Sequence, residues 1–224
     1  MDHKRWSTVD RPLSVYNGEM PTKKSNISDI SDTSNNILVA EYEYIANSAI
    51  QANEDRARVA SFYLVAVGSL VAALFSTQIF DITANFETLS FLFSGLFLVL
   101  TLLGTLTVIQ LARLRSAWYE SMAALNQIKE YAISKDRDLA KAFRWRDQSM
   151  PPLYKPNSVS YQQTIEVAIL SGLTLGAAVY FLMIGIKSSV AGANWGFTII
   201  AAIIGFIFQL YIYRRFLSRH YKEQ

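Results

Sequence analysis

The sequence predicts an all-α, polytopic membrane protein with four transmembrane helices arranged as two hairpins and a helical, coiled-coil-like cytoplasmic extension. Four stretches without a charged residue lie at 59–80, 88–112, 167–186 and 188–213. Each is about 20 residues or longer, and at about 1.5 Å per residue such a helix crosses a hydrocarbon core of roughly 30 Å. All charged residues therefore lie outside these stretches, as expected when lipid surrounds the apolar segments.

The positions of the basic residues predict how the chain is oriented. Seven Lys and Arg lie in the segment ending at Arg58, nine in 113–166 and four from Arg214 onward, whereas the connections 81–87 and 187–195 contain only Lys187. Because Lys and Arg near span ends resist translocation, we expect the N-terminus, the central loop and the C-terminus in the cytoplasm. The sequence therefore predicts a multi-pass protein of the inner (plasma) membrane. The first span is expected to act as a retained signal-anchor, since the first 36 residues contain no apolar run.

Six segments follow from these boundaries. Residues 1–36 are rich in Ser, Asn, Asp, Pro and Lys without periodicity, and are predicted to be a disordered cytoplasmic tail. Next come a cytoplasmic amphipathic helix at 37–58, a transmembrane hairpin at 59–112, a cytoplasmic helical loop at 113–166, a second transmembrane hairpin at 167–213 and a cytoplasmic tail at 214–224. Short outer turns make the two spans of each hairpin antiparallel neighbours.

Two apolar stripes run along the helices that lead into and out of the first hairpin. They recur at intervals of three and four residues, the spacing of one helical face. The first contains Leu38, Tyr42, Ile45 and Ala49, and the second contains Leu114, Trp118, Leu125 and Ile128. We expect them to pack together as an antiparallel coiled coil below the membrane; a groove for a partner helix or ligand is the alternative.

A basic and aromatic patch follows in the central loop, at Phe143, Arg144, Trp145 and Arg146. Arginine and tryptophan together suit the head-group region, so the patch is predicted to anchor the loop at the membrane surface. A sensing site for an anionic ligand is the alternative. Three prolines, Pro151, Pro152 and Pro156, end helical order after the patch.

Small residues recur every four positions within three spans. Such ladders allow close contact between helix backbones in lipid. They comprise Gly68, Ala72 and Ser76 in the first span, Gly172 and Gly176 in the third, and Ala201 and Gly205 in the fourth. The sequence predicts helix packing at these positions, partly within one chain and partly between copies in a homo-oligomer.

Several kinds of chemistry are disfavoured by composition. The four stretches contain no ionisable Asp, Glu, Lys, Arg or His, the usual mark of ion pathways and proton relays. Gln78, Gln110 and Gln209 lie toward span ends, where a hydrogen bond between helices or interfacial water explains them. With no cysteine and both histidines in the tails, we expect no enzyme, cofactor or metal site. The pI near 9.0 reflects basic groups beside the membrane, so lipid rather than nucleic acid is the expected partner.

Residues 37–134 resemble the two-transmembrane effectors of the bacterial SLATT class in the order of their parts. A helix leads into the membrane through NEDRAR at 53–58, a hairpin follows, and a continuous helix leaves through QLARLRSAWYESMAAL at 110–125. The resemblance implies spans that oligomerise and compromise the membrane when a nucleotide-sensing partner detects infection. The second hairpin departs from this two-span plan.

The sequence leaves three functions open. The leading hypothesis is an oligomeric inner-membrane effector or accessory protein that transmits a cytoplasmic signal to the membrane, with pore formation in phage defence as its sharpest form. A non-catalytic anchor or scaffold for a cytoplasmic protein partner is the second. A small-solute channel is the third, although no charged ring or filter loop is visible in the sequence.

Overall fold

The computed structural model describes residues 27–76, 86–187 and 192–220. The chain divides into a short N-terminal unit, Met1–Ile37, and a larger unit, Leu38–Gln224, which contains the helical bundle. Every regular element in the described part is a helix, and four helices are long and apolar enough to cross a membrane. The predicted all-α class with four apolar helices is therefore confirmed.

Two helices are much longer than a membrane crossing needs. Helix α1 spans Ile27–Ser76 and α2 spans Phe86–Lys135, each with 50 residues. At about 1.5 Å per residue each is about 75 Å long, more than twice the roughly 30 Å of a hydrocarbon core. Helices α4 (Val159–Lys187) and α5 (Gly192–His220) have 29 residues each. A short helix α3 (Leu139–Ala142) and a 3₁₀ turn η1 (Asp147–Ser149) lie between α2 and α4.

The start of α1 differs from the predicted boundary. The helix begins at Ile27, whereas the sequence predicted a disordered tail up to residue 36. Residues 27–36 contain neither Gly nor Pro, so nothing in them breaks a helix that is already supported further along. The rest of the predicted tail, most of the turn at 81–87 and residues 188–191 of the second turn lie outside the described residues.

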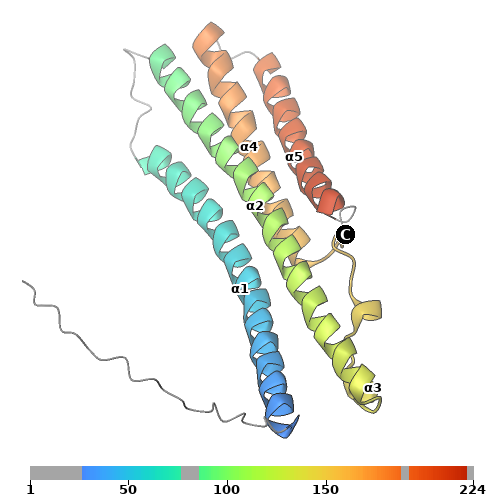
Figure 1. The fold of residues 1–224 in the computed structure, drawn as a ribbon. Coiled ribbons are helices and arrows are strands. Elements are labelled where there is room, and N and C mark those ends of the chain that lie inside the picture. The colour runs from blue at the N-terminus through green and yellow to red at the C-terminus, as the bar shows by residue number, and fades with distance from the viewer. Residues whose placement is uncertain (1–26, 77–85, 188–191, 221–224) are drawn as a thin grey trace, which may run out of the picture. The chain divides into compact units, whose positions relative to one another are not determined.

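The four long helices alternate in direction, as in two successive hairpins (Figure 1), and they share one apolar core. Helix α4 packs against both α2 and α5, and α2 also contacts α5. Helix α1 contributes Ala60, Tyr63 and Val67 to the same apolar core. We call one end of this bundle the basic end. The apolar stretches of α1 and α4 start there, at residues 59 and 167, and those of α2 and α5 finish there, at residues 112 and 213.

A tight turn leads into α4 at the basic end. The Ser158 N–H donates to the Lys155 carbonyl at 3.3 Å, and Asn157 between them has a φ of 69°. Pro156 followed by a residue with positive φ suits a type II turn, and asparagine tolerates that conformation better than most residues. Ser158 then caps α4, because its Oγ accepts from the Tyr161 N–H at 3.3 Å.

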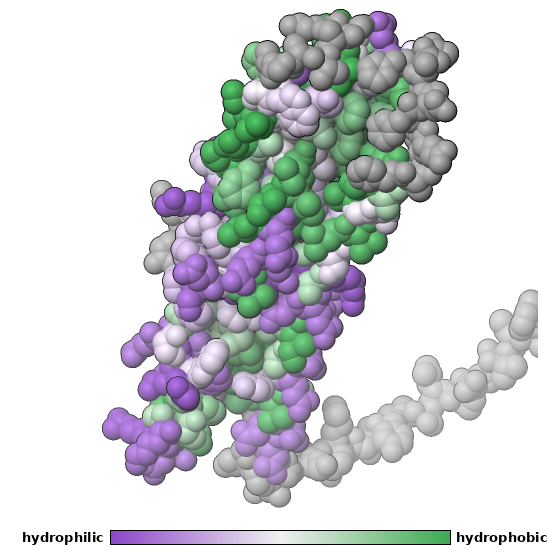
Figure 2. Space-filling view, turned by 180° about the vertical axis from the view of Figure 1, so that it is seen from behind, coloured by the Kyte–Doolittle hydropathy of each residue, from purple (hydrophilic) through white to green (hydrophobic). Residues whose placement is uncertain are grey.

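The outer surface of the bundle is apolar where the spans were predicted. Figure 2 shows hydrophobic residues over this part and hydrophilic residues over the extensions. On α5 the exposed hydrophobic residues include Ile199, Ile200, Ile203, Ile204 and Ile207. Contiguous apolar surface of this kind marks contact with membrane or protein, and it supports the multi-pass membrane character.

Candidate functional site

Polar side chains from all four long helices meet inside the apolar part of the bundle. We call this cluster the polar junction; it comprises Tyr63 of α1, Thr101 and Thr105 of α2, Ser171 and Thr174 of α4, and Gln209 of α5. Tyr63, Ser171 and Gln209 each lie about one helical turn inside the basic end of their apolar stretch. These three side chains are buried, with exposed fractions of 2%, 0% and 1%.

Hydroxyl groups connect α2 to α4. The Thr101 and Thr174 Oγ1 atoms lie 3.0 Å apart, and the Ser171 hydroxyl donates to the Thr101 carbonyl at 3.3 Å. Each threonine hydroxyl has a second acceptor on its own helix, the Phe97 carbonyl for Thr101 and the Ser171 carbonyl for Thr174. A hydroxyl has one proton, so when one threonine donates along its helix the other is free to donate across the interface.

Gln209 connects α5 to the same cluster. Its Nε2 group donates to the Thr105 Oγ1 and to the Ser171 Oγ, both at 2.8 Å. The hydrogen bond between helices expected for a glutamine near a span end is therefore present. Its Oε1 atom is buried, and no described group donates to it. A buried amide oxygen without a donor costs about 1–3 kcal/mol. The two hydrogen bonds that Gln209 donates through Nε2 hold the side chain in place despite this cost.

Gly104 of α2 makes room for the junction. A Cβ atom at this position would lie 2.5 Å from the Ser171 Oγ and 2.6 Å from the Tyr63 hydroxyl oxygen. Tyr63 donates to the Leu100 carbonyl at 3.3 Å, so its phenol crosses the surface of α2 beside Gly104. Because Gly104 has no side chain, Tyr63 of α1 and Ser171 of α4 can both contact α2 at this position.

The junction is suited to positioning helices rather than to covalent chemistry. Its members are hydroxyl groups and one amide, and no metal-binding group of three or more acidic or His residues occurs in the described part of the chain. Each long helix contributes at least one member. Sliding or rotating one helix would therefore break hydrogen bonds that have no water to replace them in lipid.

The small-residue ladders have two different environments. On α4, a Cβ at Gly172 would lie 2.7 Å from the Ala202 carbonyl oxygen, and one at Gly176 would lie 3.0 Å from the Thr198 carbonyl oxygen. On α5, a Cβ at Gly205 would lie 2.9 Å from Leu175 Cδ2. These glycines lie in the contact between α4 and α5. The contacting alanine is Ala202, while the predicted Ala201 is half-buried beside it.

The ladder on α1 faces away from this packing. Nothing lies within 4 Å of a Cβ built at Gly68, and Ala72 is exposed. The side chain of Ser76 is outside the described part. Packing among the described residues does not use the Gly68 face of α1, and contact between copies there stays a prediction.

The two predicted stripes are the more buried faces of the extensions. Along α1, Ala49 is buried, Leu38 and Ile45 are half-buried, and Tyr42 is exposed. Along α2, Leu125 is buried, whereas Leu114, Trp118 and Ile128 are half-buried. The predicted coiled coil between the stripes stays a prediction.

The basic and aromatic patch folds back along the extension of α2. Arg146 binds Glu130 through two hydrogen bonds, from Nε at 2.8 Å and from Nη2 at 2.7 Å. This bidentate ion pair lowers the pKa of Glu130, first through the hydrogen bonds from Arg146. The Lys129 Nζ donates to the Trp145 carbonyl at 3.3 Å.

This geometry disfavours the predicted membrane-surface location of the patch. Glu130 follows the end of the apolar stretch at residue 112 by about 27 Å of helix. Arg146 is paired there, Phe143 is half-buried, and Arg144 and Trp145 are exposed. The cause is the carboxylate of Glu130, which captures Arg146 far from the span.

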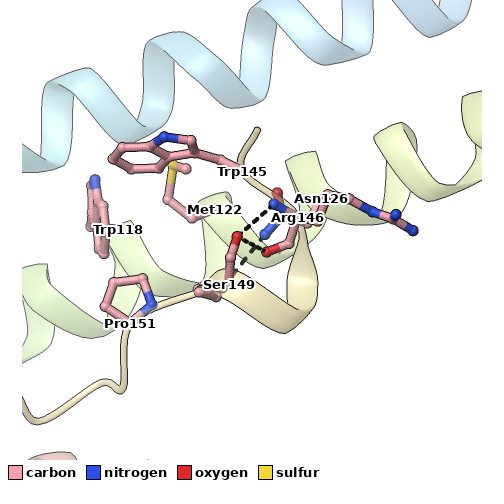
Figure 3. A pocket seen from close by; sticks show the side chains of 8 residues that line it. Trp118, Met122, Asn126, Trp145, Arg146, Ser149 and Pro151 are labelled. Carbon is pink, nitrogen blue, oxygen red and sulfur yellow. Dashed lines mark hydrogen bonds between the residues drawn. The ribbon is translucent and has the colours of Figure 1, made fainter. Parts of the chain in front are cut away.

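Trp145 and Arg146 line a small cavity of about 10 Å³ with Trp118, Met122, Asn126 and Met150 (Figure 3). The amide of Asn126 donates to the Met150 sulfur at 3.8 Å. Trp145 is 60% exposed. Two tryptophans and two methionines give this region an apolar, adaptable surface of the kind that binds other proteins.

Sequence patterns did not single out Gly104, Thr101, Ser171 or Thr174. A signal was present, since Ser171 and Thr174 are one turn apart on α4, as Thr101 and Thr105 are on α2. Their pairing depends on the register between helices that are distant in sequence. Comparison of the chain with protein-family models, curated proteins and solved structures finds no match.

Proposed function

We propose that this chain is a non-catalytic, multi-pass membrane protein that transmits a signal from its extended helices to its membrane spans. The observation that carries the proposal is the continuity of α1 and α2. Each runs unbroken from its extension through the basic end, and each joins the polar junction that also holds α4 and α5.

A continuous helix moves as a rod, so a displacement of the extension also displaces the span. Tyr63 on α1 lies against Leu100 of α2 and close to the hydroxyls of Ser171 and Thr174 on α4. Rotation of α1 would remove the phenol from this position and release the contact beside Gly104. The junction is thus the point at which movement of one rod changes the packing of the other three helices.

The proposed cellular location and trigger rest on the distribution of basic residues and on the SLATT-like order of helices in residues 37–134. Twenty of the 21 basic residues lie in the sequence segments 1–58, 113–166 and 214–224, and this asymmetry supports a cytoplasmic basic end in a plasma membrane. In the sharpest form of the proposal, several copies associate in a bacterial inner membrane and open it when a nucleotide-sensing partner detects phage infection.

Dye release from vesicles tests this proposal. The full chain is reconstituted in vesicles of phosphatidylethanolamine and phosphatidylglycerol, and is compared with Gly104→Ala and with the matched control Gly95→Ala. A Cβ at Gly95 meets nothing within 4 Å. Destabilising the junction by about 1–3 kcal/mol shifts a two-state equilibrium by about 5- to 150-fold, so Gly104→Ala should release dye faster and Gly95→Ala should not. A monomeric chain whose junction variant leaves the vesicles sealed contradicts the pore form.

A membrane anchor for a cytoplasmic protein is the second candidate, and the exposed Trp145 beside Trp118 and Met122 favours it. In that case Trp145→Ala abolishes binding of the partner without changing dye release. Trp195→Ala is the matched control, since Trp195 is 55% exposed and lies on α5. Equal loss of partner binding in both variants would count against the anchor.

A further inference from the structure

Two arginines are buried at the basic end of the bundle. Arg56 of α1 and Arg115 of α2 are each 7% exposed. Both lie less than one helical turn outside the apolar stretches that begin at residue 59 and end at residue 112. Burial of a guanidinium is rare unless an anion accompanies it.

The contacts of these arginines are with neutral groups. Arg56 Nε donates to the Gln163 Oε1 at 3.0 Å, and its buried Nη1 has no described acceptor. Arg115 Nε donates to the Leu153 carbonyl at 3.2 Å, and its Cζ lies 4.4 Å from the centre of the Trp118 ring. None of the ion pairs found among the described residues includes Arg56 or Arg115.

The pKa values of both arginines agree with the absence of a described carboxylate beside them. Burial lowers the pKa of Arg56, and Tyr213 opposes the shift. Burial also lowers the pKa of Arg115, Tyr213 again opposes it, and the positive charge of Arg56 adds to the lowering. The two positive charges therefore repel each other in a region of reduced dielectric constant, and Tyr213 is a neighbour of both.

Tyr213, the shared neighbour, belongs to a group of aromatic residues that a third arginine also contacts. Tyr213 is 2% exposed, and its hydroxyl lies 3.1 Å from the Ser160 Oγ. The Tyr161 ring contacts the rings of Tyr213 and Tyr154 at centroid distances of 6.2 and 5.8 Å. Arg214 lies over Tyr154 with its Cζ 5.7 Å from the ring centre, and it is exposed.

We propose that Arg56 and Arg115 form a binding site for a phosphate group. The free Nη1 of Arg56 supplies a donor, and guanidinium groups match phosphate oxygens in geometry as well as charge. When the apolar stretches lie in a bilayer, the site lies at the depth of the lipid phosphate groups. The phosphodiester of an anionic lipid and a free phosphate share this chemistry. The site does not depend on the proposed signalling function.

Native mass spectrometry of the detergent-solubilised full chain tests the site. Short-chain phosphatidylglycerol, short-chain phosphatidylcholine and inorganic phosphate are titrated separately. Loss of one charged hydrogen bond weakens binding by about tenfold or more, so Arg56→Gln with Arg115→Gln should weaken binding of the anion by at least about that factor. The matched control is Arg58→Gln, since that side chain is 75% exposed and pairs with Asp55. It should bind like the unchanged protein.

The three titrations separate the sources of the phosphate. Binding of phosphatidylglycerol alone identifies a lipid head group, and equal binding of inorganic phosphate identifies a free anion; either result supports the site. Because loss of both arginines could unfold the basic end, Arg115→Lys keeps the charge and should retain most of the binding. The proposal is overturned if neither anion binds better than phosphatidylcholine, or if the double variant binds like Arg58→Gln.

Discussion

The phenol of Tyr63 on α1 donates a hydrogen bond to the carbonyl of Leu100 on α2 at 3.3 Å. This bond joins two helices that both continue into long extensions, and it lies beside Gly104, where Ser171 of α4 also approaches α2. The contact thus links the part of the chain outside the apolar stretches to the packing of the spans.

Gly104→Ala should destabilise the bundle. The added Cβ would lie 2.5 Å from the Ser171 Oγ and 2.6 Å from the Tyr63 hydroxyl oxygen, so these side chains or the helices that carry them must move. Overpacking of this kind costs about 1–3 kcal/mol, and thermal unfolding in detergent measures it. Gly95→Ala on the same helix should be neutral or stabilising, because its Cβ meets open space. Equal unfolding temperatures for both variants would show that Gly104 does not limit the packing.

Tyr63→Phe should have a smaller effect than Gly104→Ala. It removes one hydrogen bond between helices, which contributes about 0.6 kcal/mol on average and up to about 1.7 kcal/mol in membranes. Tyr44→Phe is the matched control, because Tyr44 lies on the same helix and is 69% exposed. The measurement is again the free energy of unfolding. No difference between the two variants would mean that the phenol contributes only through its ring.

Gly68→Ile tests whether copies associate through α1. The site is open inside the chain, so the larger side chain should leave the unfolding temperature unchanged and reduce self-association in native mass spectrometry. Gly95→Ile places the same side chain in open space on α2 and serves as the control. Association that survives Gly68→Ile, or that both variants abolish, would exclude a specific role for the Gly68 face.

The Glu130–Arg146 ion pair should hold residues 143–150 against α2 in a pH-dependent way. Hydrogen bonds from Arg146 lower the pKa of Glu130 below its ordinary value of 4.5 in the folded chain. The stabilisation is therefore fully present above that value and is lost as the pH falls through the lowered pKa. Hydrogen exchange of 143–150 should be faster in Glu130→Gln than in the unchanged protein at pH 7. The two proteins should converge when Glu130 is protonated, and identical exchange at pH 7 would contradict the role of the pair.

The sequence predicted the spans well because charge is excluded from lipid whatever the partner helix is. It did not predict which small residues pack inside the chain. Gly172 and Gly68 belong to similar ladders, yet one contacts the α5 backbone and the other faces away. Gly104 was not part of any ladder, and its role arises only because Tyr63 and Ser171 reach it from two other helices.

The basic residues illustrate the same limit. Counting them predicts an orientation, but it does not distinguish Arg56 and Arg115, which are buried, from Arg58, which is exposed. It also gave no sign that Arg146 would pair with Glu130. Such choices depend on partners that are brought together only when the helices pack.

Single-cysteine labelling in intact cells tests most directly whether the four helices cross a membrane with the basic end inside. The chain has no cysteine of its own, so each introduced thiol is the only one present. Ser134→Cys reports on the extension of α2, and Ala84→Cys and Ser189→Cys report on the connections at the other end of the bundle. A membrane-impermeant maleimide should label the latter two in intact cells, and Ser134→Cys only after the cells are opened. Labelling of Ser134→Cys in sealed cells would rule out a cytoplasmic basic end.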